Sequence, residues 1–217
     1  MLVVSHRGYH RHHPENTLAA FEAAIQLGVD GLEADIRLSA DDVALLFHNR
    51  LAPDGREVRA VTHPELTAAA GYPVPTLDEA LALWPDRFWV LEIKRPEALA
   101  ATVEILKSRG PGFHCLVISF WHTVVLELRK HLDVDCGILM SQRPLDLAGA
   151  IDRRFRERGV ETIVWNYEYL DEGLVDKARA LGYRSMVYNP QSAEQHRHCA
   201  AMKIAAAITD YPELLIS

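Results

Sequence analysis

The strongest constraint on the fold is an alternation of short and long segments that runs along nearly the whole chain. Short apolar, β-branched runs typical of strands alternate with longer stretches whose apolar residues recur at helical spacing. Core strands are predicted at Leu2–Ser5, Gly31–Leu38, Phe88–Lys94, Cys115–Ser119, Asp135–Met140, Thr162–Asn166, Arg184–Asn189 and Ile204–Thr209. Helices are predicted at Thr17–Leu27, Pro96–Ser108, Trp121–Leu132, Leu145–Arg158, Glu172–Leu181 and Ser192–Met202.

Eight strand–helix units predict an α/β fold of the (βα)8 TIM-barrel type, with a doubly wound open sheet as the rival. The strand count favours the barrel, and 217 residues is near the short end of its size range. We therefore expect one catalytic domain over residues 1–217. One interruption follows the second strand: an extra short strand at Val43–Phe47, then an insertion at about residues 49–74.

Most of this insertion, residues 49–72, is rich in proline, glycine and charge, which predicts a loop. Thr76 comes shortly after it, and Glu79 follows three residues later. This is the spacing of a capping box, so a helix is expected to begin after Thr76.

Composition and charge narrow the classes of partner. The net charge of −7 and the absence of a dense basic run argue against a nucleic-acid-binding protein, although a bound cation and a few basic side chains could still create a phosphate site. No apolar run approaches the roughly 18 residues of a transmembrane helix, and a cytoplasmic location is the default expectation. Oligomeric state cannot be read from the sequence. Three cysteines, Cys115, Cys136 and Cys199, lack metal or disulfide spacing and are expected to be reduced and at least partly buried.

Polar residues end three of the predicted apolar strands. In a parallel barrel the functional face lies at the carboxyl ends of the strands. The first strand ends in His6 and Arg7, whereas the others carry Glu33 with Asp35 and Glu92 with Lys94. Because side chains alternate along a strand, both members of each spaced pair point to the same side. We expect all four to face the barrel interior.

The three carboxylates Glu33, Asp35 and Glu92 would repel one another and resist losing their water. Such a group needs cations, and all-oxygen ligands suit Mg²⁺ or Ca²⁺ better than zinc. A carboxylate at a strand end is more often a salt-bridge partner or a helix cap. Its recurrence on neighbouring strands favours a metal site.

Two histidines and two cations complete the candidate site. His6 and His48 end predicted strands, and imidazole can give or take a proton at neutral pH, so they are candidates for general acid and base. Arg7 and Lys94 are candidates for binding substrate phosphate, because a guanidinium grips two oxygens and an ammonium neutralises a third. Structural histidines and surface salt bridges are the ordinary alternatives. The aromatic residues Phe120, Trp121, Trp165 and Tyr188 either line the pocket or belong to the core.

The order of these residues resembles the glycerophosphodiester phosphodiesterase family. The opening motif is His6-Arg7-Gly8, then five residues, then Pro14-Glu15-Asn16-Thr17, and the likeness continues through Glu33-Ala34-Asp35, His48, Glu92-Ile93-Lys94 and Thr209-Asp210-Tyr211-Pro212. The resemblance implies a barrel phosphodiesterase that releases sn-glycerol 3-phosphate and an alcohol. It implies Mg²⁺ or Ca²⁺ on the three carboxylates, with the two histidines as acid and base.

Two departures from that pattern leave questions for the structure. Asn49 stands where the family usually has an aspartate after the histidine, and residues 51–55 replace the usual Arg-Thr-Thr-Gly stretch. The partner of His48 and the enclosure of the leaving group are therefore open. The loop that contains His10, His12 and His13 either borders the substrate entrance or, as we expect, is a solvated polar loop.

Several functional alternatives also stay open. The attack on phosphorus can come from water or from the glycerol 2-hydroxyl through a cyclic phosphate. A lysophospholipase D-like lipid phosphodiesterase is one rival function. A catalytically silent barrel that binds phosphate ligands is another.

Overall fold

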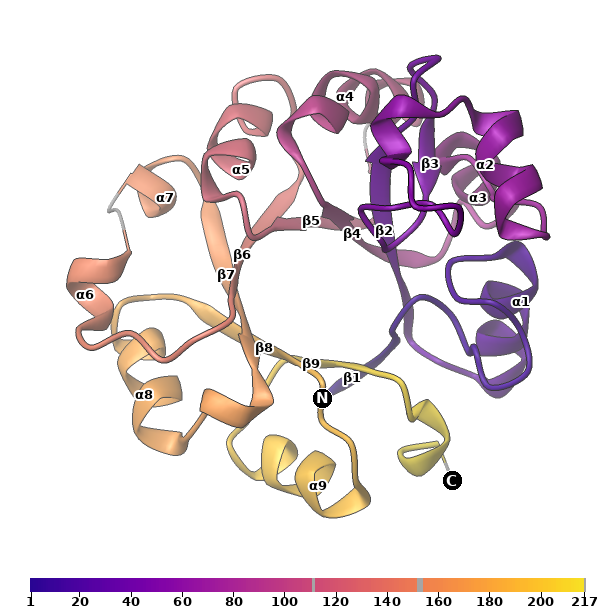
Figure 1. Cartoon of the computed structure of the whole chain (residues 1–217). Helices are drawn as coiled ribbons and strands as arrows, with labels where there is room; N and C mark the ends of the chain where they lie inside the picture. Colours follow the sequence, from indigo (N-terminus) through magenta and orange to yellow (C-terminus); the bar gives the residue numbers. More distant parts are fainter. Residues whose placement is uncertain (111, 152–153, 217) are drawn as a thin grey trace.

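The chain folds into a closed barrel of eight parallel strands surrounded by helices (Figure 1). The computed structural model describes residues 1–110, 112–151 and 154–216. The parallel strands are β1 (Leu2–Ser5), β2 (Gly31–Leu38), β4 (Phe88–Ile93), β5 (Cys115–Ser119), β6 (Asp135–Met140), β7 (Val160–Asn166), β8 (Arg184–Tyr188) and β9 (Ala206–Thr209). Strand β1 pairs with both β2 and β9, which closes the ring. The TIM-barrel prediction is confirmed, and the open-sheet alternative is excluded.

Helices follow the strands and cover the outside of the barrel (Figure 1). They are α1 (Leu18–Leu27), α3 (Leu77–Leu83), α4 (Leu99–Ser108), α5 (His122–Leu128), α6 (Leu147–Ala150), α7 (Arg154–Glu157), α8 (Glu172–Ala180) and α9 (Ala193–Ala201). The helix predicted at Leu145–Arg158 is instead the two short helices α6 and α7, and positions 152–153 of that prediction lie outside the described residues. The capping box predicted before α3 is present, with Thr76 and Glu79 as its two members.

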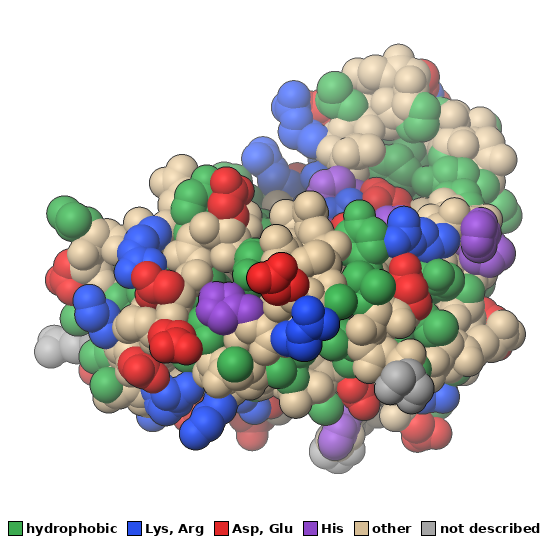
Figure 2. Space-filling view, turned by 90° about the horizontal axis from the view of Figure 1, so that it is seen from below, with side chains coloured by type: hydrophobic (Ala, Val, Ile, Leu, Met, Phe, Trp, Pro, Cys, Tyr) green, Lys and Arg blue, Asp and Glu red, His purple; other side chains and the backbone are tan. Residues whose placement is uncertain are grey.

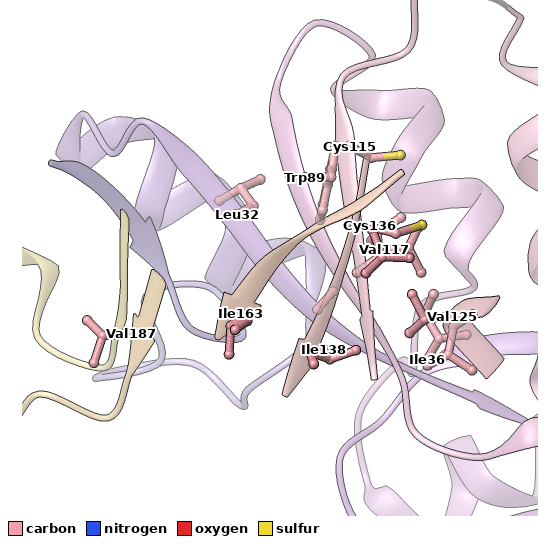
Figure 3. Close-up of a cluster of buried hydrophobic side chains, with 14 of the residues drawn as sticks. Leu32, Ile36, Trp89, Cys115, Val117, Val125, Cys136, Ile138, Ile163 and Val187 are labelled. Atoms are coloured by element: carbon pink, nitrogen blue, oxygen red, sulfur yellow. The ribbon is translucent and has the colours of Figure 1, made fainter. Parts of the chain in front are cut away.

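Strand alternation divides the apolar residues between two cores. Side chains such as Leu32, Trp89 and Ile163 point outward and pack under the helices, as the close-up in Figure 3 illustrates. The residues that alternate with them along the strands point inward, and these residues, including Val90 and Leu116, fill the barrel interior. The interior core therefore lies below the mouth of the barrel. The inward-pointing polar side chains lie at this mouth, at the carboxyl ends of the strands.

A lobe built from the segment after β2 rises beside the mouth. Strand β3 (Ala44–Leu46) pairs antiparallel with β2, and a separate buried cluster that includes Val58, Val61 and Leu66 packs behind it. In the side view of Figure 2 a lobe stands over the part of the barrel where Figure 1 places β3 and α2. Basic and histidine side chains are visible at its foot.

The prediction of a loop at residues 49–72 is partly wrong, because this segment contains helix α2 (His63–Ala70). Thr62 caps the helix, Glu65 completes a capping box, and a proline lies in the first turn. Leu66 anchors the helix in the buried cluster. The proline and glycine content obscured these local signals.

The cysteines agree with expectation, since Cys115, Cys136 and Cys199 are free and buried. Burial raises the pKa of Cys115 to about 12, so its thiol stays protonated at neutral pH. In the described part of the chain, no helix is both long and apolar enough to cross a membrane.

Candidate active site

The strand register brings the predicted site residues to one end of the barrel. Asp35 on β2 lies beside Glu92 on β4, and Ser5 on β1 pairs with Thr209 on β9. The residues that follow this last pair, His6 and Asp210, consequently meet at the mouth. A cavity of about 260 Å³ opens there, lined by His6, Arg7, Glu33, His48, Glu92, Lys94, Ile118, Phe120, Leu139, Tyr188, Asn189 and Ile208.

The turn after β1 has an unusual backbone conformation. Arg7 has φ 55° and Gly8 has φ 76°, both in the left-handed region. A side chain on Gly8 would place its Cβ 2.6 Å from the backbone of Ala20, so only glycine fits against α1. The turn directs the Arg7 amide to the Glu33 carboxylate, with a nitrogen–oxygen distance of 3.0 Å. The His-Arg-Gly sequence therefore anchors the turn to a candidate metal ligand.

Asp35 is the electrostatic centre of the site. Its carboxylate is completely buried and lies 2.9 Å from Arg7 Nε, 3.1 Å from Lys94 Nζ and 3.1 Å from His48 Nδ1. Burial alone would raise the pKa of Asp35. The hydrogen bond to His48 and the charges of Lys94 and Arg7 outweigh burial and hold this pKa well below its ordinary value. Asp35 is therefore ionised, and it contacts three other predicted site residues, Arg7, Lys94 and His48.

Asn16 contacts the site but was not among the predicted site residues. Its side-chain amide donates to Asp35 Oδ2 at 2.9 Å, and its carbonyl accepts from the Asp35 amide at 3.1 Å. Asn16 has φ 56°, a conformation that asparagine tolerates. The next residue, Thr17, is the N-cap of α1. The sequence signal that could have identified Asn16 is an asparagine directly before the helix N-cap Thr17.

Glu33, Asp35 and Glu92 form a compact buried acidic cluster. Each offers a carboxylate oxygen within 4.8 Å of the others. Burial and the charge of Asp35 raise the pKa of Glu92, and the same causes raise the pKa of Glu33 well above its ordinary value. The cluster therefore has more negative charge than its surroundings can stabilise.

This donor set fits a hard divalent cation. Lys94 Nζ lies 2.9 Å from Glu92 and 3.1 Å from Asp35, which compensates part of the charge. Even so, Asp35 Oδ1 is buried, and no group in the described residues makes a well-directed hydrogen bond to it. A cation with oxygen ligands would satisfy that atom and remove the penalty on both glutamates.

His48 takes its carboxylate partner from the barrel and not from the next residue. Its Nδ1 faces Asp35, and Arg7 Nη2 lies 3.4 Å from its Nε2. Arg37 donates two hydrogen bonds to the His48 carbonyl, at 2.9 and 2.7 Å, which fix the backbone. Asn49 is exposed. The Asp35 carboxylate thus supplies the orienting charge that the usual aspartate after this histidine was expected to provide.

His6 is oriented by Asp210, a residue missing from the predicted site. His6 Nδ1 lies 2.6 Å from Asp210 Oδ1, and His10 Nε2 lies 3.0 Å from the same oxygen. Burial would raise the pKa of Asp210, but these two histidines hold it far below its usual range. The hydrogen bond to Asp210 also raises the pKa of His10. The loop prediction holds for the exposed His12 and His13 and is wrong for His10.

The opposite wall of the cavity is mostly apolar. Phe120 and Tyr188 meet edge to face with ring centroids 6.1 Å apart, so two of the four candidate aromatic residues line the pocket. Trp165 is buried in the outer core. Trp121 is exposed and stacks with the Arg95 guanidinium, 5.1 Å from the ring centroid.

A parallel barrel whose mouth gathers carboxylates, basic side chains and two oriented histidines has the architecture of a hydrolase for anionic substrates. Comparison with known families makes the class specific. The chain belongs to the glycerophosphoryl diester phosphodiesterase family, whose sequence model matches residues 6–214. It is therefore an enzyme of the glycerophosphodiester phosphodiesterase class.

Individual relatives agree with this assignment. The glycerophosphodiester phosphodiesterase of Caldanaerobacter subterraneus is 26% identical over 244 residues, covering 100% of this chain and 96% of that protein. The crystal structure of the Thermotoga maritima glycerophosphodiester phosphodiesterase matches with a TM-score of 0.86 and 27% identity, over 100% of this chain and 97% of the other. An Oleispira antarctica phosphodiesterase, solved with the product sn-glycerol-3-phosphate, has the same fold, with a TM-score of 0.86, 24% identity and coverage of 100% and 97%.

Proposed function

We propose that this enzyme hydrolyses glycerophosphodiesters to sn-glycerol 3-phosphate and an alcohol, with a divalent cation and histidine acid–base catalysis. The observation that carries the proposal is the convergence of the acidic cluster, Arg7, Lys94, His6 and His48 on one cavity. The Oleispira antarctica neighbour supports the choice of product, because it was solved with sn-glycerol-3-phosphate.

Glu33, Asp35 and Glu92 are the proposed ligands of Mg²⁺ or Ca²⁺. When bound, the cation would withdraw negative charge from the phosphoryl oxygens. Arg7 and Lys94 would bind the remaining oxygens. Both sit within 3.1 Å of Asp35, so they are held in place before substrate arrives.

The two histidines have different electrostatic surroundings, which suggests their roles. Arg7 Nη2 can only donate to His48 Nε2, so this nitrogen presents a lone pair and His48 is suited to be the base. His6 lies between carboxylates, with Nδ1 on Asp210 and Nε2 3.9 Å from Glu33. These charges compensate an imidazolium, so His6 is suited to protonate the departing alkoxide.

The nucleophile is either water or the glycerol 2-hydroxyl. A substrate analogue with hydrogen in place of the 2-hydroxyl separates the routes. Turnover at the normal rate excludes a cyclic phosphate. Loss of turnover with retained affinity supports a cyclic phosphate intermediate.

The dimensions of the cavity favour a small substrate. Its volume is about 260 Å³, and the rings of Phe120 and Tyr188 pack together in its apolar wall, which leaves little room for a fatty chain. A lysophospholipase D-like activity is therefore not favoured. We also propose that residues 1–217 act as one catalytic domain, in which the insertion at about 49–74 forms one side of the mouth.

The decisive experiment is release of glycerol 3-phosphate from glycerophosphocholine after chelation, followed by addition of Mg²⁺, Ca²⁺ or Mn²⁺. We expect activity only with added cation. Substitution of His6 or His48 by alanine should abolish turnover without unfolding the protein, whereas His12→Ala, in an exposed loop position, should not.

The acid and base assignments require a second substrate. With a p-nitrophenyl ester, whose leaving group needs no proton, the His6→Ala variant should lose much less activity than His48→Ala. The reverse order would overturn the assignment. Full activity without any divalent cation would refute the metal role.

A further inference from the structure

A second group of metal-ligating side chains lies beside the acidic cluster. His6 Nδ1 and His10 Nε2 lie 2.6 and 3.0 Å from the same oxygen of Asp210, and one ligand atom from each residue lies within 4.8 Å of the others. The side chains are 20%, 28% and 31% exposed, so solvent ions can reach them. This group combines two nitrogens with one oxygen, unlike the all-oxygen cluster.

Two imidazoles and one carboxylate form a donor set that zinc prefers. Zinc–ligand bonds of about 2.0–2.1 Å in a tetrahedral site place neighbouring ligand atoms roughly 3.3 Å apart. The observed separations of 2.6 and 3.0 Å are slightly shorter, so small outward side-chain movements would admit an ion. Three protein ligands would leave the fourth position to water.

The surrounding charges also favour a cation. Asp210 itself is the carboxylate of this group, and on the inner side the carboxyl group of Glu33 lies 3.9 Å from His6 Nε2. The two arginines of the same loop have carboxylate partners of their own: Arg7 pairs with Glu15, and Arg11 pairs with Glu213. A positive ion at Asp210 would therefore not meet an uncompensated guanidinium from either residue.

We propose that His6, His10 and Asp210 form a second metal site that takes Zn²⁺, and that its occupation inhibits the enzyme. The inhibitory part rests on the proposed role of His6. An imidazole bound to zinc through Nδ1 carries a proton on Nε2 and cannot take up another. The His6 ring then loses the second protonation state that acid–base catalysis needs. Asp210, bound to zinc, would also no longer orient this ring.

The first test measures binding and does not depend on turnover. Protein saturated with Mg²⁺ is titrated with Zn²⁺ by calorimetry, and with Co²⁺, whose visible absorption reports tetrahedral coordination. His10→Gln removes one ligand, and His13→Gln is the matched control from an exposed position in the same loop. We expect one equivalent of Zn²⁺ to bind the wild type and the control, and at least tenfold weaker binding by His10→Gln. Equal binding by both variants would overturn the site.

The second test measures inhibition of glycerophosphocholine hydrolysis by Zn²⁺ at saturating Mg²⁺. Each variant is compared with its own rate without zinc. The inhibiting zinc concentration should rise at least tenfold for His10→Gln and stay unchanged for His13→Gln. Relief of inhibition by more Mg²⁺ would overturn the proposal, because zinc would then occupy the acidic cluster. If the enzyme lacks activity altogether, the proposed function fails, while calorimetry still decides the zinc site.

Discussion

The two walls of the active-site cavity are built on opposite principles. The wall formed by β1, β2 and β4 holds buried carboxylates, Arg7 and Lys94 in mutual contact. The wall formed mainly by β5, β6, β8 and β9 presents apolar side chains such as Ile118, Leu139 and Ile208. The strand residues of both walls follow the same inward alternation and differ in residue type, whereas Arg7 is placed by the turn after β1.

The contrast teaches how one barrel can both bind an anion and orient it. Charges on the polar wall are fixed by one another, so they need little rearrangement when a phosphate arrives. If the proposed function is right, the apolar wall would not compete for the phosphate and would contact the carbon skeleton of the substrate. We expect substitutions on the two walls to separate catalysis from packing.

The largest effect is expected for Asp35→Asn on the polar wall. It removes the charge that Arg7, Lys94 and His48 share, and it leaves buried cations with weaker compensation. Stability should fall by about 3 kcal/mol, and turnover by roughly a thousandfold or more. Urea unfolding and steady-state kinetics measure the two losses. A variant that kept turnover within tenfold would show that the polar wall is not catalytic.

Leu139→Ala tests the apolar wall. Leu139 is buried in the barrel interior, so its truncation should cost about 2–3 kcal/mol of stability through lost burial and a residual cavity. Turnover should change by less than about tenfold, because the polar contacts remain. Urea unfolding and steady-state kinetics measure the two effects. A loss of activity as large as that of Asp35→Asn would mean that the two walls are not functionally separate.

Asp210→Asn tests, through pH, the carboxylate that follows β9 and faces His6 of the polar wall. Because the pKa of Asp210 is lower in the folded chain, its ionised form stabilises the fold above the unfolded-state pKa of about 4. We expect a stability difference of about 1 kcal/mol from wild type near neutral pH, which disappears as pH falls toward the lowered pKa. Denaturant unfolding from pH 7 to pH 3 measures the start of this loss, which begins below the unfolded-state pKa. A difference that stayed constant across this range would contradict it.

The smallest effect is expected for Asn49→Asp, which restores the usual family residue. Asp35 already faces His48 Nδ1, and residue 49 is exposed. Stability should change by less than about 0.5 kcal/mol, and turnover by less than about threefold. A rate increase of tenfold or more would show that Asp35 does not replace the missing carboxylate. Kinetics across pH 6 to 8 would reveal it.

The sequence predicted the barrel and the inward direction of Glu33, Asp35, Glu92 and Lys94, because strand alternation is a local property. It did not predict that Lys94 bridges Asp35 and Glu92, or that Asp35 alone has a lowered pKa among the three carboxylates. Those properties depend on distances between strands.

Asp210 was missed although its motif was recognised. A closed barrel places the last strand beside the first, so the pairing of Ser5 with Thr209 could have suggested that Asp210 meets His6. The position of His10 beside Asp210, in contrast, is set by a loop backbone that no periodicity describes. Helix α2 was missed for another reason: its capping box was local and legible, but the composition around it was typical of a loop.

The contact between His6 and Asp210 spans 204 positions of the sequence and depends on the pairing of β1 with β9. During translation β1 is synthesised long before β9. In that interval His6, the proposed proton donor, lacks its orienting carboxylate Asp210. A nascent chain that has not yet extended past residue 210 therefore cannot assemble the complete site. Barrel closure thus delays assembly of the complete site until β9 and Asp210 have joined β1.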